Sequence, residues 1–118
     1  MKQTIQFFLN SLARKKQLRM LLPAVPVTVL FRDGDECCLV AFSKERCVQL
    51  ETGNADFELE MALRQFEQLL SRRARLGTFL KMGELRYRGT YRHFLLLESL
   101  FWLSGTPQPA PKSKAKSA

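Results

Sequence analysis

Residues 82–103 read MGELRYRGTYRHFLLLESLFWL and contain two hydrophobic patterns in direct succession. Over 84–88 apolar and charged residues alternate, which is typical of a half-buried strand. Gly89 ends the alternation, and Thr90 is a suitable N-cap for a helix over 91–103. This helix is apolar on more than one face, although a surface helix needs only one apolar stripe. Its second face is therefore expected to contact another helix, a partner or a ligand.

The helix predicted over 91–103 is too short to cross a membrane. A bilayer-spanning helix needs about 20 apolar residues, whereas this run has about 13 and is ended by Gly105 and Pro107. The sequence therefore predicts a buried or ligand-facing helix of a soluble protein.

The elements upstream of this stretch predict an α+β domain. Apolar residues recur at helical spacing from Ile5 to Leu22, and Pro23 and Pro26 end that helix. An Asp33-Gly34 pair predicts a hairpin between the first two strands. The predicted strands cover 27–31, 36–42, 47–51, 57–61 and 84–88, and the predicted helices after the first cover 62–70, 76–80 and 91–103.

The polarity of three strands predicts where they lie. The strand over 36–42 is apolar on both faces and is therefore expected in a central, covered position. In the strand over 47–51, Val48 and Leu50 are expected to face inward. Glu58 and Glu60 on one strand and Arg86 and Arg88 on another carry opposite charges, which predicts that these two strands are neighbours.

Length and composition predict one domain over 1–105 and a disordered tail over 106–118. The tail, TPQPAPKSKAKSA, has no aromatic or large aliphatic residue and is rich in proline and lysine. The three cysteines, Cys37, Cys38 and Cys47, lie in apolar segments without a zinc-like spacing. We expect them to be reduced core thiols of a cytoplasmic protein.

No residue pattern for catalysis is present. The sequence has no glycine-rich phosphate loop, no H-E-x-x-H and no G-x-S-x-G. His93 is the only histidine and begins an apolar helix, where a structural role is expected. The sequence therefore predicts a protein that is not an enzyme and that has neither a metal site nor a cofactor, apart from a bound lipid or fatty-acyl ligand.

Large apolar residues exceed what one helix layer on a sheet obviously needs. Pockets for apolar molecules are lined in this way, with few polar groups. The competing interpretation is that these residues fill a solid core, and composition alone favours it. The predicted lipid-binding residues are Phe66, Leu70, Phe79, Leu80, Leu85, Phe94, Leu97, Phe101 and Trp102.

Two basic clusters are candidates for contact with an anionic membrane. The net charge is +8, which favours polyanionic partners. No aromatic residue is interleaved with the arginines in the sequence, so the pattern favours a membrane over a nucleic acid, which would need stacking side chains. The clusters are Arg14, Lys15, Lys16 and Arg19 on the first helix, and Arg72, Arg73 and Arg75 after the paired leucines.

The chain resembles the sterol carrier protein-2 family over roughly residues 5–104, most clearly in its second half. The resemblance rests on the paired Leu69-Leu70 and on the G-x-L-x-x-x-G motif over 83–89, directly before a final apolar helix. Two positions depart from the family pattern. Thr90 stands where an aspartate is usual, and the glycine usual after the paired leucines is replaced by the Ser71-Arg72-Arg73 run.

This resemblance implies a five-stranded, mostly antiparallel sheet covered by helices, in the order α-βββ-β-α-β-α. It also implies a hydrophobic tunnel between sheet and helices and a non-catalytic activity, the binding or transfer of a lipid or another apolar small molecule. The short hairpin region implies a smaller sheet and a reduced cavity. The alternative function is a basic interaction or adaptor protein with a filled core, which binds a protein partner or nucleic acid.

Overall fold

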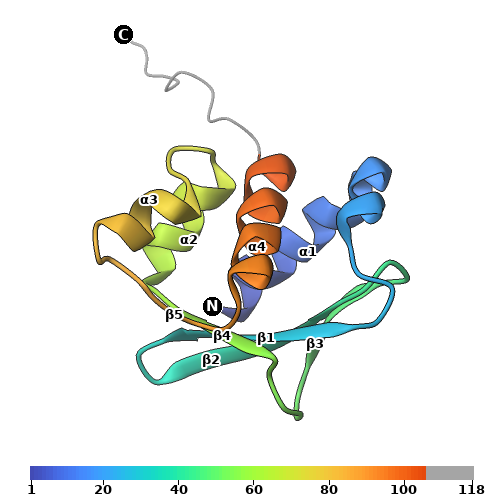
Figure 1. The fold of residues 1–118 in the computed structure, drawn as a ribbon, viewed down its shortest axis with the longest axis horizontal. Helices are drawn as coiled ribbons and strands as arrows, with labels where there is room; N and C mark the ends of the chain where they lie inside the picture. The colour runs from blue at the N-terminus through green and yellow to red at the C-terminus, as the bar shows by residue number, and fades with distance from the viewer. Residues whose placement is uncertain (106–118) are drawn as a thin grey trace, which may run out of the picture.

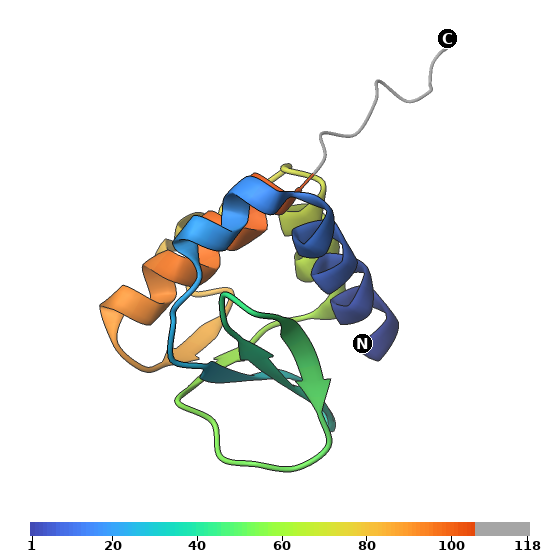
Figure 2. The same ribbon diagram turned by 90° about the vertical axis from the view of Figure 1, so that its right-hand side faces the viewer.

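The structure is a computed structural model that describes residues 1–105 as a sheet with all its helices on one face (Figures 1 and 2). It confirms the predicted α+β class. The tail predicted over 106–118 lies outside the described residues. The elements in chain order are α1 (Lys2–Arg14), the 3-10 helix η1 (Lys16–Leu21), β1 (Val27–Asp33), β2 (Glu36–Phe42), β3 (Cys47–Leu50), β4 (Phe57–Glu60), α2 (Leu63–Leu70), α3 (Leu76–Lys81), β5 (Arg86–Arg88) and α4 (Tyr91–Ser104).

The sheet has five strands in the order β3-β2-β1-β4-β5. Only β1 and β4 run parallel, so the sheet is mostly antiparallel, as predicted. The predicted neighbours β4 and β5 do pair, with Glu58 opposite Arg88 and Glu60 opposite Arg86. The ion pair of Glu58, however, is made on its other side with Arg32 of β1, at 3.1 Å.

The first helix is shorter than the sequence predicts. α1 ends at Arg14, Lys15 leaves the helical region with φ −105° and ψ 85°, and a 3-10 helix follows. The break redirects the chain so that η1 packs against α4, with Leu18 and Leu22 buried. Burial in the tertiary structure thus overrides the helical spacing that suggested one continuous helix, and Arg14, Lys15, Lys16 and Arg19 do not share a single helix.

The residues of β3 that face the helices are the opposite of those that the sequence predicts. Gln49 pairs with the buried Val40 and therefore faces the helices, so that Val48 and Leu50 lie on the outer face of the sheet. Gln49 is tolerated on the inner face because it lies at the edge of the sheet, where its amide donates to the backbone carbonyl of Lys2 at 3.1 Å. The polar residue is satisfied there by α1.

β2 is central, but no helix covers its outer face. Both views of the ribbon place every helix on the other side of the sheet (Figures 1 and 2). Cys37 is exposed on the outer face, whereas Leu39 is buried. The loop after β3 protects Leu39, because a Cβ at Gly53 would lie 3.3 Å from its side chain. A loop therefore takes the place of the expected second layer.

α4 is the central helix of the helical layer and contacts α1, η1, α2 and α3. This explains why it is apolar on more than one face. The predicted cap is present, since the Thr90 hydroxyl accepts a hydrogen bond from the backbone N–H of His93. Glu98, one of the few charged residues of α4, accepts a 2.8 Å hydrogen bond from the backbone N–H of Gly77 in α3. Within residues 1–105, no helix has the length and apolar character that crossing a membrane requires.

Candidate functional site

An aromatic cluster lies between the sheet and α4, where the sequence predicts an apolar cavity. Phe66, Leu97 and Phe101 are fully buried there. The Phe101 ring stacks on Phe8 with 4.6 Å between ring centroids, and it meets Phe66 edge to face at 6.0 Å. These contacts place the rings at the separations of well-packed aromatic pairs.

Most of the residues predicted to bind a lipid come together in this core. Leu70, Phe79, Leu85 and Phe94 belong to the same buried cluster as the three residues above. Leu80 and Trp102 do not: Leu80 is 40% exposed on α3, and Trp102 is half-buried on α4 beside Arg72 and Arg75. The assignment of the buried residues to a lipid cavity stays a prediction.

The two predicted basic clusters meet at the C-terminal end of α4. Lys15 Nζ donates a 2.9 Å hydrogen bond to the carbonyl oxygen of Leu103, and Arg72 Nη2 donates to the same oxygen at 3.5 Å. The last carbonyl groups of a helix lack intrahelical donors and carry partial negative charge. Two cations that are far apart in the sequence therefore cap the same helix end.

Trp102 is the aromatic partner of the second cluster. The guanidinium of Arg75 lies 4.2 Å from the centroid of the Trp102 ring, and that of Arg72 lies 5.5 Å away. Both are cation–π distances. No aromatic residue is interleaved with these arginines in the sequence, but the fold brings Trp102 to them from another element. Arg73 is exposed beside this site.

A groove of about 510 Å³ opens at the start of α4. Its apolar wall is the segment that joins η1 to β1, together with Leu96, and its polar residues are few. The sequence pattern predicts only a structural role for His93 and does not indicate this groove. The residues that line it are Leu21, Pro23, Val25, Pro26, Val27, Asp56, Arg92, His93 and Leu96.

His93 has an unusual environment at this groove. Its ring stacks on Phe57 with 4.7 Å between centroids. Its Nδ1 atom is the one buried side-chain nitrogen or oxygen within residues 1–105 that has no hydrogen-bond partner. Buried polar atoms in proteins are nearly always paired, so an unpaired one calls for an explanation.

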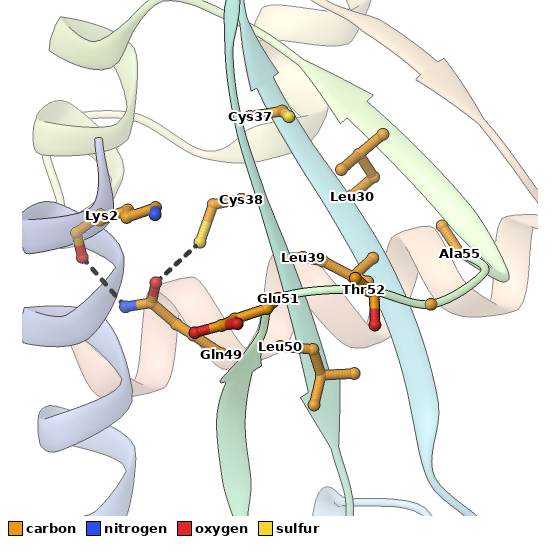
Figure 3. Close-up of a pocket in the computed structure, with 11 residues that line it drawn as sticks. Lys2, Leu30, Cys37, Cys38, Leu39, Gln49, Leu50, Glu51, Thr52 and Ala55 are labelled. Atoms are coloured by element: carbon orange, nitrogen blue, oxygen red, sulfur yellow. Dashed lines mark hydrogen bonds between the residues drawn. The ribbon is translucent and has the colours of Figure 1, made fainter.

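A second pocket, of about 660 Å³, lies at the β3 edge of the sheet (Figure 3). On its helix side, the thiol of Cys38 donates to Gln49 Oε1 at 3.1 Å, and the Gln49 amide donates to the Lys2 carbonyl. On the other side of the sheet lie Leu30 and Cys37. Burial raises the pKa of the Cys38 thiol, which makes this thiol a poor nucleophile at neutral pH.

The described residues contain no cluster of titratable side chains of the kind that metal sites require. Within 1–105, no three histidine, cysteine, aspartate or glutamate residues gather in a way that could hold a metal ion.

Comparison with solved structures identifies the fold. The UbiJ-SCP2 ubiquinone synthesis protein superposes with a TM-score of 0.60 at 19% identity, over 75% of this chain and 78% of that one. Sterol carrier protein 2 from Yarrowia lipolytica, in its apo form, gives 0.55 at 16% identity, over 84% of each chain. This protein has the sterol carrier protein-2 fold. The resemblance seen in the paired leucines and the G-x-L-x-x-x-G motif is thereby confirmed as a shared fold.

The sterol carrier protein-2 fold also occurs as part of a larger chain. The sec-alkylsulfatase Pisa1 from a Pseudomonas species matches with a TM-score of 0.59 at 16% identity, over 79% of this chain but 15% of that one. No protein-family model matches the sequence, and comparison with curated proteins finds no match. At these identities, likeness shows the fold alone, and one fold can serve several functions.

Proposed function

We propose that this protein binds a lipid or another apolar small molecule without catalysing a reaction on it. The observation that carries the proposal is the sterol carrier protein-2 fold itself, which the chain shares with a sterol carrier protein over 84% of its length. Helices that cover one face of a sheet leave an apolar interlayer, and such interlayers and their mouths are common places for apolar ligands.

Native mass spectrometry of the gently purified protein tests the proposal. We expect one apolar molecule per chain, released by organic extraction. The gain in melting temperature on adding back the extracted molecule gives a second readout, because a ligand that binds only the native state stabilises it. A protein that carries no such molecule, and that no long-chain fatty acid, fatty alcohol or sterol stabilises, contradicts the proposal.

Contact with an anionic membrane is part of the same proposal. A carrier must collect an apolar cargo from a membrane, and basic residues near the surface attract anionic headgroups. The meeting of the two basic clusters at one end of α4, beside Trp102, supports this assignment. Tryptophan is well suited to such a boundary because its ring is apolar and its N–H is polar.

A second candidate function is an interaction protein with a filled core. The close packing of Phe101 on Phe8 and Phe66 favours it, because these rings occupy the space between α4 and the sheet. Several large apolar side chains are also exposed, Met20 and Val25 among them. The mass-spectrometric experiment separates the two functions, since an interaction protein would retain a macromolecular partner and no apolar small molecule.

A further inference from the structure

The solvent side of α4 carries large apolar residues. Tyr91, Leu95, Ser99 and Trp102 follow one another at helical spacing, so they lie on one stripe of the helix. Tyr91 is 70% exposed and Leu95 is 41% exposed, whereas Trp102 is half-buried. The solvent side of a helix in a globular protein is normally polar, and exposed apolar residues that lie together mark interaction sites.

α3 runs beside α4 in the opposite direction. Arg75, the N-cap residue of α3, lies over the ring of Trp102, and the backbone N–H of Gly77 donates to Glu98. Residue numbers that increase along α3 therefore meet residue numbers that decrease along α4. Leu80, which is 40% exposed near the end of α3, accordingly lies toward the start of α4.

η1 borders the other side of α4 and is also antiparallel to it. Lys15, the N-cap residue of η1, donates to the Leu103 carbonyl at the end of α4, and Leu21 lines a groove with Leu96 nearer the start. Leu21 is 44% exposed and Leu103 is 39% exposed. The stripe on α4 therefore has an apolar border on both sides. We call this surface the α4 face; its apolar residues are Leu21, Leu80, Tyr91, Leu95, Trp102 and Leu103.

The charges around the α4 face are almost all positive. Glu98 is the one acidic residue in η1, α3 and α4, and it is half-buried and already accepts the hydrogen bond from Gly77. Arg92 is exposed at the start of α4, and Arg72 and Arg75 lie beside Trp102 near its end. A partner that complements this surface is therefore apolar in its middle and acidic at its margins.

This charge pattern disfavours two occupants from the chain itself. A second copy would bring the same cations to the contact. The segment 106–118 has three lysines and no large apolar residue. A bilayer fits the geometry poorly, because interfacial segments bury their apolar side chains about 5–10 Å deep. The leucines of the α4 face are instead more than half covered by the helices around them.

We propose that the α4 face binds an amphipathic helix of a partner protein. Its apolar stripe packs on Tyr91 and Leu95, and its acidic side chains pair with Arg92 at one end and Arg75 at the other. Ser99 is a small residue in the middle of the stripe, where a packed helix can approach closely. Recognition of a helix by its apolar stripe is a recurring mode of protein binding. The inference does not depend on whether the core carries a lipid, since it adds a macromolecular partner.

Two synthetic peptides test the proposal. Each forms a helix of about five turns, about 18 residues, with leucines on one stripe of an alanine background. The positions that flank the leucines are glutamates in one peptide and lysines in the other. We expect the glutamate peptide to bind about tenfold or more tightly at low salt, and the difference to narrow as salt is raised. Calorimetry measures both affinities, and Trp102 fluorescence reports contact with the α4 face because it is the only tryptophan.

Three variants and a matched control locate the contact. Leu95→Ser should weaken binding of the glutamate peptide about tenfold, as expected for a central apolar anchor. Tyr91→Ser should also weaken it, and its position is the more exposed of the two. Arg92→Glu should reduce the preference for glutamate over lysine. Phe7→Ser is the control, because Phe7 is an apolar residue on α1 that is 57% exposed. Melting temperatures establish that each variant is folded.

Several outcomes overturn the proposal. Equal affinities for the two peptides do so, as does a glutamate peptide that binds Leu95→Ser and Tyr91→Ser as tightly as the unmodified protein. Loss of binding to phosphatidylserine vesicles in these variants, with peptide binding unchanged, assigns the face to a membrane instead. A dimer in light scattering that Leu95→Ser abolishes assigns it to a second copy. The carrier function is tested separately, by the apolar molecule that co-purifies.

Discussion

Arg72 and Trp102 are joined by a hydrogen bond and a stack. Arg72 Nε donates to the carbonyl oxygen of Trp102 at 2.7 Å, and the guanidinium lies 5.5 Å from the ring centroid of the same residue. Arg72 is also the one non-glycine residue within 1–105 with a positive φ, at 60°. It directly follows Ser71, the C-cap of α2, at the left-handed position that glycine usually occupies.

Replacing Arg72 separates its backbone strain from its side-chain contacts. Arg72→Ala removes the contacts with α4 but keeps the strained backbone, so we expect a loss of about 1–2 kcal/mol in the free energy of unfolding. Arg72→Gly removes the same contacts and relieves the strain, so it should be more stable than Arg72→Ala by about 1 kcal/mol. Urea unfolding of both variants measures the difference, and equal stabilities would contradict the argument.

Phe101 is expected to be the most costly aromatic residue to truncate. It is 1% exposed and packs against Phe8, Phe31 and Phe66, so Phe101→Ala should destabilise the protein by about 3–5 kcal/mol. Leu103→Ala, at an exposed position on the same helix, is the control and should cost less than about 1 kcal/mol. A loss below about 2 kcal/mol for Phe101→Ala would show that the space around the ring is already hollow.

The stability of the fold should decrease at alkaline pH. Burial raises the pKa of the Cys38 and Cys47 thiols above the ordinary value of 9.0, and it raises the pKa of the Tyr87 hydroxyl as well. The unfolded chain therefore releases these protons first as pH rises. The free energy of unfolding should be unaffected by the thiols below pH 9 and should fall above it. The Cys38→Ala, Cys47→Ala double variant should show a smaller fall between pH 8.5 and 10 in urea-unfolding experiments.

The basic residues beside Trp102 should bind anionic vesicles at low salt. Replacing Arg73 and Arg75 with serine should reduce binding to vesicles that contain phosphatidylserine, because each basic residue near the surface contributes about 1 kcal/mol. Binding should weaken as salt is raised, since ions screen exposed charges. A second series replaces Arg14, Lys16 and Arg19 with serine and keeps Lys15, because Lys15 donates a hydrogen bond at the end of α4. Vesicle co-sedimentation measures both series.

A nucleic-acid control is needed in the vesicle experiment. The stack of Arg75 on Trp102 supplies the aromatic contact that the sequence alone lacked, and single-stranded nucleic acids bind such surfaces. A single-stranded oligonucleotide that binds more tightly than the vesicles at the same salt concentration would contradict the membrane assignment and favour the interaction-protein function. Trp102 fluorescence reports on both ligands because it is the only tryptophan.

The sequence by itself determined the element types and the neighbours of two strands. Alternation and helical spacing are visible within short stretches of sequence. The bounds of α4, β4 and β5 were therefore predicted within one or two residues of the observed ones. The charges on Glu58, Glu60, Arg86 and Arg88 predicted the β4–β5 pair because cross-strand neighbours lie within reach of one another. The paired leucines and the spaced glycines predicted the family of folds.

Only the tertiary structure decided the break at Lys15, the register of β3 and the groove at His93. Helical spacing continues through Lys15, but packing of η1 on α4 buries Leu18 and Leu22 only if the chain turns there. Gln49 faces inward because α1 offers it a backbone partner, which no local pattern encodes. The groove and the Arg75–Trp102 stack join residues from elements distant in the sequence, so their chemistry exists only after the helices have packed on the sheet.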